Sequence, residues 1–552
     1  MFKTFLIIAL VSLCATQNPT DSLRFLSTTT EETVFDLSKS DPFLSQFHDP
    51  KFLSSLDDQD NPTDFSCEMR KTSKLDPAKA APFYFVPALK AKVLPDDKVV
   101  EWSNGCFGKN TAQITKFTKE EMVVTLSHSD KKFYFCKDTY LVSTFDYNFL
   151  HFSFSTYQKT IVLKNLTDDQ FATIKFNGIK FHTFCQNVKQ SLWSIFETAK
   201  LFLGGMSADP NAWTTFFSSH VPQYMETANI NFVTELAGFN LKLRTTDKKV
   251  LEIDPKNIRS GDFVAIRRWD GVDPLIMWGT GTHIGHTAVA MWEDGELYVY
   301  ESQDGWYWPR HGIQKNKWAY WIEHAQNADF EVSILPLSDE MSQKFDVEKA
   351  LNKYQELAGL DYGYRNFLFG WLDTADHNLP VFVDFDIVAT ILTLLERIIP
   401  SVVKLIIGEA LNARMNTMNK TIPEIAAIAA GKGMKLGEVV AMPELEEYRY
   451  SNGQNLVCSS FCTAMWKAGG LFDDMEILPS EFGPNDVYQL KIFNPAPKLP
   501  GICTATDPSL PYCQLTGKYL MELPNYNSVT PYSKMNERCP SIGPAYLRQD
   551  GC

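Results

Sequence analysis

Residues 283–303, HIGHTAVAMWEDGELYVYESQ, are the stretch of this chain that says most about its fold. Glu293-Asp-Gly-Glu296 is a turn signal between two apolar, strand-forming runs, and this pattern predicts an antiparallel hairpin. Whether the loop holds two residues or four, position 292 opposes 297 and position 288 opposes 301. Because side chains alternate along a strand, the residues on each face of the hairpin can be assigned.

One face of the predicted hairpin carries a histidine and a carboxylate. His286 and Glu301 share this face as diagonal cross-strand neighbours, which places their backbone positions about 7–8 Å apart. The rest of the face is Ala, Trp, Leu and Val, where an unpaired carboxylate costs on the order of several kcal/mol. We therefore expect Glu301 to orient His286, as in a catalytic triad; a satisfied core pair is the alternative. His283 has the opposite parity and is the lesser candidate.

A candidate nucleophile lies in NLVCSSFCTAMWKAGG, residues 455–470. Cys458, Phe461, Cys462 and Met465 form one helical stripe, and the Ala-Gly-Gly that follows should end the helix. Cys458 lies in the predicted first turn, where the aligned peptide dipoles and free N–H groups favour a thiolate. A nearby imidazole would favour it further. Cys462, one turn deeper, is expected to be a packed core residue.

The totals describe an ordinary globular protein with a secretory start. The 552 residues include 52 Lys+Arg and 66 Asp+Glu, for a net charge of −14, and without clustered basic residues we expect no nucleic-acid partner. Residues 1–17 have one lysine, a short apolar run and small residues, as in a signal peptide. The run is too short to span a bilayer. Cleavage near Ala15–Gln17 is expected rather than an uncleaved anchor, in a secreted protein or one in an endolysosomal or secretory lumen.

Ten cysteines would remain after this cleavage. Eight of them fall into an early and a late group of four, which suggests two disulfides in each group: Cys67, Cys106, Cys136 and Cys185; Cys503, Cys513, Cys539 and Cys552. The pairing within each group is open. Cys458 and Cys462 are expected to stay thiols because they are four residues apart on a helix. The sequons at Asn165 and Asn419 are candidate glycosylation sites at the surface.

The sequence suggests several regions. They are a signal peptide at 1–17, a polar leader, propeptide or strap at 18–66, a β-rich domain at 67–189, a helical linker at 190–250, a catalytic domain at 251–500 with a helical insertion at about 376–445, and a cysteine-rich tail at 501–552. The strands expected in the β-rich domain are FYFVPAL, MVVTLSH, KKFYFC, FLHFSFSTY and TIVLKNL.

An apolar stretch at 387–411 interrupts the catalytic region. Charged residues and Pro400 break it, so it should not span a membrane. Instead it predicts one kinked or two short amphipathic helices. Packing of these helices on the catalytic core is the favoured interpretation, and contact with lipid is the alternative.

Several short motifs occur in an order that resembles a known family. GDF at 261–263 is followed by GHTAVAM, YVYES, a Tyr-Gly segment and VCSSF. This order resembles the circularly permuted papain-like cysteine amidohydrolases of the YaeF/YiiX type, in the cell-wall hydrolase superfamily. In that branch the histidine and its polar partner precede the cysteine, as they do here. The similarity covers roughly 251–480 and implies an α+β fold: a permuted papain-like domain, here with a β-rich N-terminal domain and a disulfide-rich C-terminal tail.

The resemblance also implies a role for each motif residue. Cys458 would be the nucleophile, His286 the general base and acid, and Glu301 the orienting residue. In Gly359-Leu-Asp-Tyr362, Tyr362 would position substrate or contribute to the oxyanion site. The backbone N–H of Cys458 would be a second oxyanion donor.

The expected function is hydrolysis through a thioester. Peptide-like amides, including bacterial wall peptides, are the first expected substrates, and lipid esters or acyl transfer are the second. The mechanism needs no metal or organic cofactor. A catalytically silent secreted scaffold or binding protein is the competing class.

Two further groups of residues are candidates for a role in this site. Trp306 and Trp308 lie in an aromatic stretch at 304–321 that is either a substrate platform or a packed loop. A zinc site built on His283, His286, Glu301 and His311 lacks a supporting motif.

Overall fold

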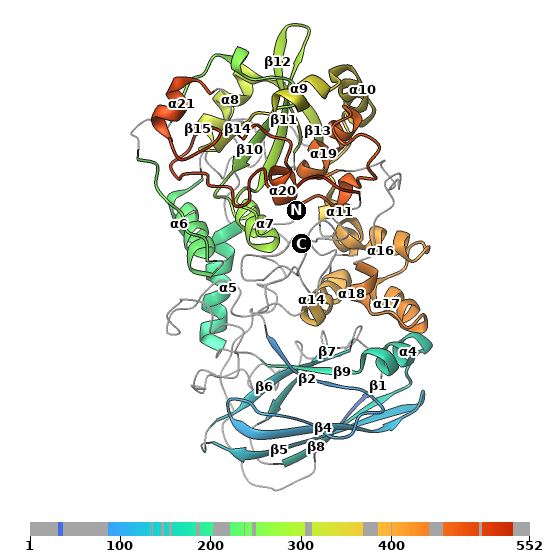
Figure 1. The fold of residues 1–552 in the computed structure, drawn as a ribbon. Coiled ribbons are helices and arrows are strands. Elements are labelled where there is room, and N and C mark those ends of the chain that lie inside the picture. Colours follow the sequence, from blue (N-terminus) through green and yellow to red (C-terminus); the bar gives the residue numbers. More distant parts are fainter. Residues whose placement is uncertain are drawn as a thin grey trace. The chain divides into compact units, whose positions relative to one another are not determined.

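The computed structural model is described in two compact units. They comprise Met1–Ala199 with Val381–Val439, and Lys200–Pro380 with Val440–Cys552 (Figure 1). The structure describes residues 31–36, 87–132, 134, 136–144, 148–153, 157–183, 188–202, 221–236, 238–245, 250–303, 312–367, 385–398, 400–440, 456–495 and 499–533. The chain is mixed in class, with helices and sheets in both units.

The first unit contains two sheets. One is five-stranded, with β1 (Glu31–Asp36), β8 (Tyr157–Lys164), β5 (Glu121–Lys131), β4 (Phe107–Phe117) and β3 (Val100–Trp102) in that order. The other holds β2 (Ala88–Val93), β9 (Ile179–Thr183), β6 (Asp138–Ser143) and β7 (Asn148–Ser153). Buried apolar residues from both sheets form one core, and buried and part-exposed residues alternate along β5, as expected for a half-buried strand. β1, from the predicted polar leader, pairs in parallel with β8.

The structure contains some of the strands predicted for this unit. MVVTLSH lies within β5, and FLHFSFSTY and TIVLKNL overlap β7 and β8. KKFYFC is described only in part: Lys131 ends β5, Lys132, Tyr134 and Cys136 lie outside any strand, and residues 133 and 135 lie outside the described residues. Lys132 donates its backbone N–H to Cys106 O. A disulfide joins Cys106 to Cys136. At the described positions the prediction was wrong because aromatic composition suits a strand but does not reveal that the chain passes from the sheet of β5 to the sheet of β6.

The helical insertion belongs to the first unit. Its elements are α14 (Phe385–Ile398), α15 (Pro400–Val403), the π-helix η4 (Lys404–Gly408), α16 (Glu409–Arg414), α17 (Ile422–Gly431) and α18 (Leu436–Val440). α14 ends at Ile398 and α15 begins at Pro400, and residue 399 between them lies outside the described residues, so the predicted break at Pro400 stays a prediction. α17 contacts α4 (Asp168–Asn177) and α14 contacts β2 (Figure 1). The insertion thus groups with the β-rich unit, and its packing on the catalytic core stays a prediction. In the described residues, no helix is both long and apolar enough to cross a membrane.

The two sequon asparagines lie on this same unit. Asn165 and Asn419 are exposed and have positive φ angles of 58° and 55°. Two residues on, Thr167 and Thr421 cap α4 and α17 through capping boxes. Both predicted acceptor sites are thus at the surface, and glycosylation itself stays a prediction.

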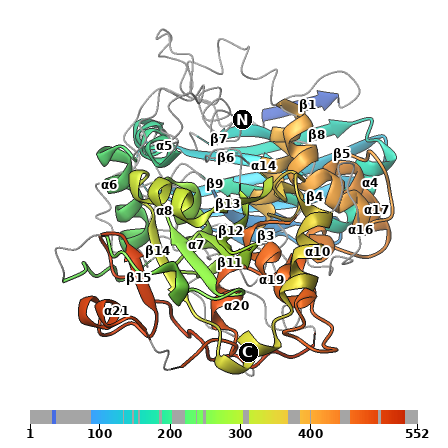
Figure 2. The ribbon, with the colours of Figure 1, turned by 90° about the horizontal axis from the view of Figure 1, so that it is seen from above.

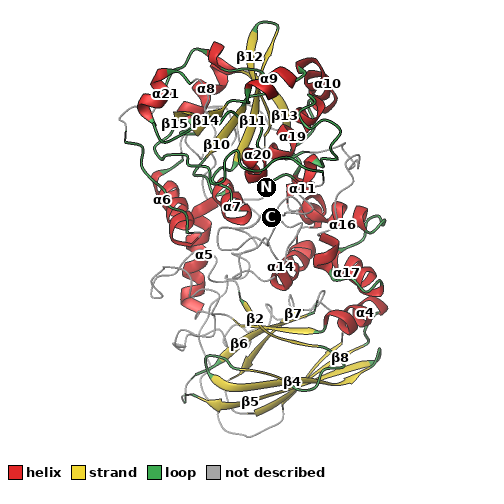
Figure 3. Ribbon diagram, in the orientation of Figure 1, coloured by secondary structure: helices red, strands yellow, loops and turns green. Residues whose placement is uncertain are grey.

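The second unit is built on a six-stranded sheet (Figure 3). The strand order is β13 (Gly312–Lys317), β12 (Glu296–Gln303), β11 (His286–Glu293), β10 (Phe263–Arg267), β14 (Glu331–Leu335) and β15 (Cys513–Thr516). Trp292 pairs with Leu297 and Val289 with Tyr300, so the predicted hairpin register is confirmed. The loop holds two residues, Asp294 and Gly295, both with positive φ, as a type I′ turn requires.

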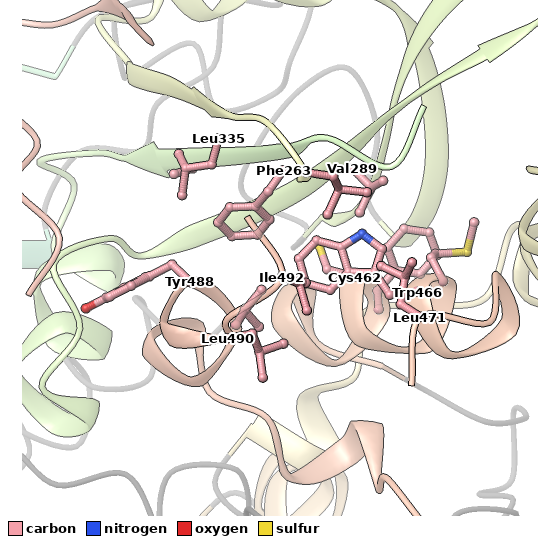
Figure 4. Packing of buried hydrophobic residues seen from close by; sticks show 14 of the residues in the cluster. Phe263, Val289, Leu335, Cys462, Trp466, Leu471, Tyr488, Leu490 and Ile492 are labelled. Atoms are coloured by element: carbon pink, nitrogen blue, oxygen red, sulfur yellow. The ribbon is translucent and has the colours of Figure 1, made fainter. Parts of the chain in front are cut away.

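Helices cover both faces of this sheet. α8 (Trp318–Asn327) contributes Trp318 and Trp321 to a core with Ala288 and Ala290 of β11. α19 (Cys458–Ala468) packs on the other face, and Figure 2 shows the two helices on opposite sides of β11 and β12. Figure 4 shows Cys462 and Trp466 of α19 directed towards Phe263 and Val289 of the sheet. Burial on both faces explains why β10 and β14 are buried along their whole length.

The predicted cysteine-rich tail is part of the second unit where the structure describes it. It supplies the edge strand β15, and a disulfide joins Cys503 to Cys513. Arg244, from the predicted linker, forms a buried ion pair with Asp507, with Nη2 2.6 Å from Oδ2. The other disulfide candidates, Cys67, Cys185, Cys539 and Cys552, lie outside the described residues. The remaining helices among the described residues are α5 (Val188–Phe202), α6 (Gln223–Asn231), η2 (Phe232–Leu236), η3 (Pro255–Asn257), α7 (Val272–Thr280), α9 (Asp339–Lys344), α10 (Val347–Leu357), α11 (Tyr364–Phe367), η5 (Pro479–Glu481), α20 (Pro484–Gln489) and α21 (Gly501–Thr506).

A buried histidine should make the first unit sensitive to acid. His128 is 2% exposed and its Nδ1 lies 2.7 Å from Asn110 Oδ1. Burial, with repulsion from Lys159, lowers the pKa of His128 to about 4. The unfolded chain, with a histidine pKa of about 6.5, takes up this proton first as the pH falls. We expect the full contribution to stability above pH 6.5 and a loss of up to about 3 kcal/mol by pH 4.

Hydrogen exchange of peptides from β4 and β5 would measure this loss of stability. His128→Gln retains an amide donor for Asn110 but cannot titrate, so its protection should fall less steeply between pH 6.5 and 4. Parallel pH dependence in the two proteins would contradict the prediction.

Candidate active site

Glu301 holds the imidazole of His286 from the neighbouring strand. The Nε2–H of His286 donates to Glu301 Oε2 at 2.9 Å, and the indole Nε1–H of Trp321 donates to the other carboxylate oxygen at 3.0 Å. The two residues are buried: His286 is 2% exposed and Glu301 is 0% exposed. The predicted contact between His286 and Glu301 is therefore confirmed, and the role of Trp321 was not foreseen. An indole donor on a following helix leaves no signal in the hairpin sequence.

The thiol of Cys458 reaches the same imidazole. Cys458 is the first residue of α19, and Val457, at the N-cap, provides no side-chain hydrogen bond to the helix. The side chains of Cys458 and His286 lie close enough for each to shift the pKa of the other. Because Nε2 faces Glu301, Nδ1 is the ring nitrogen available to the sulfur. His286 is the first residue of β11, so its ring lies at the strand end, where groups from both faces of the sheet can meet.

The thiol and the imidazole shift each other's protonation. Burial by itself lowers the pKa of His286, as does the charge of Arg268, but hydrogen bonds to Cys458 and Glu301 outweigh both and raise that pKa to about 9. Burial likewise raises the pKa of Cys458, yet the hydrogen bond and attraction to His286, with help from Thr287, bring it below its usual value. These opposite shifts favour a thiolate–imidazolium pair, the reactive form of a cysteine nucleophile.

The second thiol of this helix has a different environment. Cys462 is fully buried among the apolar residues beneath the sheet, and its Sγ–H donates to Thr287 Oγ1 at 3.4 Å. Burial raises its pKa well above the ordinary thiol value. The expectation of a packed core cysteine is confirmed, and the pKa values of the two thiols on α19 are shifted in opposite directions.

The N-terminus of α19 is fixed by a carbonyl two residues before the thiol. Leu456 O accepts the hydroxyl of Ser302 at 2.7 Å and the backbone N–H of Gly363 at 3.1 Å. Ser302 follows Glu301 directly, so β12 positions both the imidazole and the helix that carries Cys458. Ser302 and Gly363 could not be identified from the sequence, because neither residue type has a chemical signature and their partner is a backbone carbonyl.

Gly363→Ala should separate the thiol from the imidazole. A Cβ at this position would lie 2.5 Å from the carbonyl carbon of Leu456 and 2.7 Å from Val457 N. Both are backbone atoms, so the helix start must move. We expect the alkylation rate of Cys458 at neutral pH to fall by about 10- to 100-fold, as is typical of a misplacement near 1 Å. Gly359→Ala is the control: it strains a positive φ in the same loop but meets nothing within 4 Å. Equal losses in both variants would point to loop destabilisation instead.

The other predicted site residues fall into three groups. Tyr362 is buried and stacks edge-on with Tyr364, ring centroids 5.0 Å apart; it adjoins Gly363 and so lies in the loop that contacts the start of α19. Trp306 and Trp308 lie outside the described residues. His283 is held elsewhere: its Nδ1 lies 2.8 Å from Glu522 O, and burial lowers its pKa to about 4.

No metal-binding cluster was found in the part of the chain that the structure describes: nowhere do three or more His, Cys, Asp or Glu side chains gather to share an ion. His311, from the zinc alternative, is outside that part. Comparisons of the chain with protein-family models, curated proteins and solved structures found no match. The chemistry is therefore inferred from the geometry of Cys458, His286 and Glu301.

Proposed function

We propose that the second unit is a cysteine hydrolase that cleaves amide bonds through an acyl-thioester intermediate. The observation that carries this proposal is that one imidazole, that of His286, is hydrogen-bonded to Glu301 and interacts with the thiol of Cys458. A buried histidine–glutamate pair alone is a common core interaction. A thiol with a lowered pKa at a helix N-terminus, bonded to that same imidazole, is the arrangement that nucleophilic catalysis requires.

Each residue would have one role in the reaction. The thiolate of Cys458 attacks the carbonyl carbon, and the resulting oxyanion lies near the N-terminal N–H groups of α19. The imidazolium of His286 then gives its proton to the leaving amine as the tetrahedral intermediate collapses to a thioester. In the second half, neutral His286 takes a proton from water, which displaces the acyl group and restores the thiol. Glu301 holds the imidazole throughout and stabilises its charged form.

The permuted papain-like architecture is part of the same proposal. A cysteine on the first residue of a helix, packed against a sheet whose strand begins with the histidine, supports it. The order of His286, Glu301 and Cys458 along the chain fits the permuted branch. Secretion is supported by the signal-like N-terminus and by disulfides in both units.

Peptide-like amides are the first proposed substrates, and fatty-acyl esters are the alternative. The ester alternative drew on the apolar segment at 387–411, which groups with the first unit rather than with the unit that contains Cys458. A catalytically silent scaffold would not need the lowered pKa of Cys458, which costs burial of a charge.

Trapping the acyl-enzyme would test the proposal. The protein is incubated with a panel of peptide amides, including peptides of bacterial wall composition, and with fatty-acyl esters, then quenched in acid. Mass spectrometry of the Cys458 peptide should detect an acyl adduct from the amides, with matching product release. Cys462→Ala is the control and should retain the adduct, because that thiol lies in the core.

Three outcomes separate the alternatives. An adduct and turnover only with fatty-acyl esters would replace the amidase with a lipid esterase or acyltransferase. Normal alkylation of Cys458 with no turnover of either class would favour the scaffold. Turnover that persists in Cys458→Ala would overturn the nucleophile assignment.

A further inference from the structure

An arginine–carboxylate ion pair, Arg268 with Asp273, lies beside the proposed catalytic residues. Arg268 follows β10 and is 3% exposed. Its Nε and Nη2 donate to the carboxylate of Asp273 at 3.1 and 2.9 Å, and the backbone N–H of Arg268 donates to the same group at 2.8 Å. Two guanidinium nitrogens and one backbone N–H thus bind the same carboxylate, and this bidentate geometry restricts the movement of the guanidinium.

The surroundings of this pair place it next to His286. A Cβ on Gly285, the residue before His286, would lie only 2.2 Å from Asp273 Cβ, so the carboxylate side chain packs directly against that backbone. Arg268 Nη1 donates to Gln303 Oε1 at 3.4 Å. Gln303 is two residues beyond Glu301 on β12, and alternation puts both on the face that His286 shares. The guanidinium is therefore held between two neighbours of the imidazole.

We infer that Arg268 is a positioning residue that keeps the His286 imidazolium able to release its proton, by fixing a second positive charge beside it. The inference rests on the proposed function, in which this imidazolium must protonate a leaving group. Glu301 and the Cys458 thiolate both stabilise the imidazolium and so hold its proton tightly. A general acid works best when its proton affinity matches the working pH, and a fixed neighbouring cation opposes the two anions.

The charged groups around the imidazole shift its pKa in the directions that this role requires. Glu301 from β12 and Cys458 from α19 raise the pKa of His286, whereas burial and Arg268 lower it. The charge of Arg268 also reaches Cys458 and lowers the pKa of the thiol. Asp273, from α7, senses the charge of His286 in turn. Removing the arginine charge should thus favour the protonated forms of both thiol and imidazole.

The test is the pH dependence of Cys458 alkylation by iodoacetamide, followed by mass spectrometry of the Cys458 peptide. The wild-type profile should have two midpoints that belong to the coupled thiol–imidazole pair. In Arg268→Met both should move to higher pH, the upper one by about 1 pH unit, as loss of a nearby charge in a partly shielded site predicts. Arg268→Lys retains the positive charge but not the bidentate hydrogen bonds, and its alkylation midpoints should stay closer to those of the wild type.

Arg267→Met is the matched control. Arg267 precedes Arg268, is 1% exposed, and forms its own buried pair with Glu331, Nη2 to Oε2 2.5 Å. Arg267→Met therefore also removes a buried, paired guanidinium, from the position next to Arg268. Its melting temperature should fall, but its alkylation midpoints should stay where they are. Equal shifts in the Arg267 and Arg268 variants would overturn the inference, since general loosening would explain both.

The opposite charge change provides an independent test. Asp273→Asn removes an anion from the same pair and should move the midpoints to lower pH. If Arg268→Met does not fold, this variant still decides the matter: an unchanged or upward midpoint contradicts the inference. Alkylation needs no substrate, so a protein that gives these shifts but turns over no amide would contradict only the proposed function.

Discussion

Alanine at Cys458, at His286 or at both positions is expected to lower amide turnover to one common floor, about 10³-fold or more below wild type. The reason is that the thiol is a strong nucleophile only as a thiolate, which the imidazole stabilises, while the imidazole has no proton to move without the thiol. Once either side chain has been replaced, replacing the other should lower the turnover rate little further. Steady-state rates on the best substrate of the acyl-trapping panel would measure this.

The control for this set is Cys462→Ala, which should retain most of the activity because Cys462 is a core thiol on the same helix. Thermal unfolding is recorded for every variant, since His286→Ala leaves the buried Glu301 with one partner fewer. Losses that simply multiply in the double variant would mean that the two side chains act independently, and the proposed pair would be wrong.

Glu301→Gln is expected to lower kcat/KM by roughly 10³- to 10⁴-fold with little loss of fold, the size seen for the equivalent amide exchange in a serine triad. The structure fixes how the new amide would lie. Trp321 Nε1–H can only donate, and it donates to Oε1 of Glu301. The amide oxygen must therefore face Trp321, and its NH₂ group must face His286.

That orientation imposes the wrong tautomer on the imidazole. Nε2 of His286 would have to accept a hydrogen bond where it now donates one, so the proton would move to Nδ1. Nδ1 could then no longer take the proton of Cys458. Adding Trp321→Phe to the Gln variant removes the donor that fixes the amide, which can turn and restore part of the activity, about 10-fold. Partial recovery is expected because the buried NH₂ group would then lack a partner. A further loss of activity in the double variant would contradict this account.

The hairpin was predictable because its geometry is local. Asp294-Gly295 sets the loop, strand periodicity sets the faces, and together they placed His286 beside Glu301 without knowledge of any other part of the chain. The start of α19 at Cys458 was predictable for the same reason, as the apolar stripe and the glycines after it define a short helix.

The meeting of the hairpin and the helix was inferred from family resemblance and could not be derived from spacing. It depends on how α19 packs under the sheet, through contacts such as Trp466 with Phe263, ring centroids 5.7 Å apart. A local error had a similar origin: KKFYFC has strand composition, but Cys136 is joined to Cys106 by a disulfide and lies between strands of two different sheets.

The amino-acid sequence by itself determined which residues share a strand face or a helix turn, because those relations follow from fixed backbone periods. Only the tertiary structure decided that Leu456 is held by Ser302 and Gly363, that Arg268 lies beside His286, and that the tail supplies β15. These contacts join segments far apart in the chain. They form because buried apolar surfaces fit together and buried polar groups must find partners, and neither condition can be evaluated within a short window of sequence.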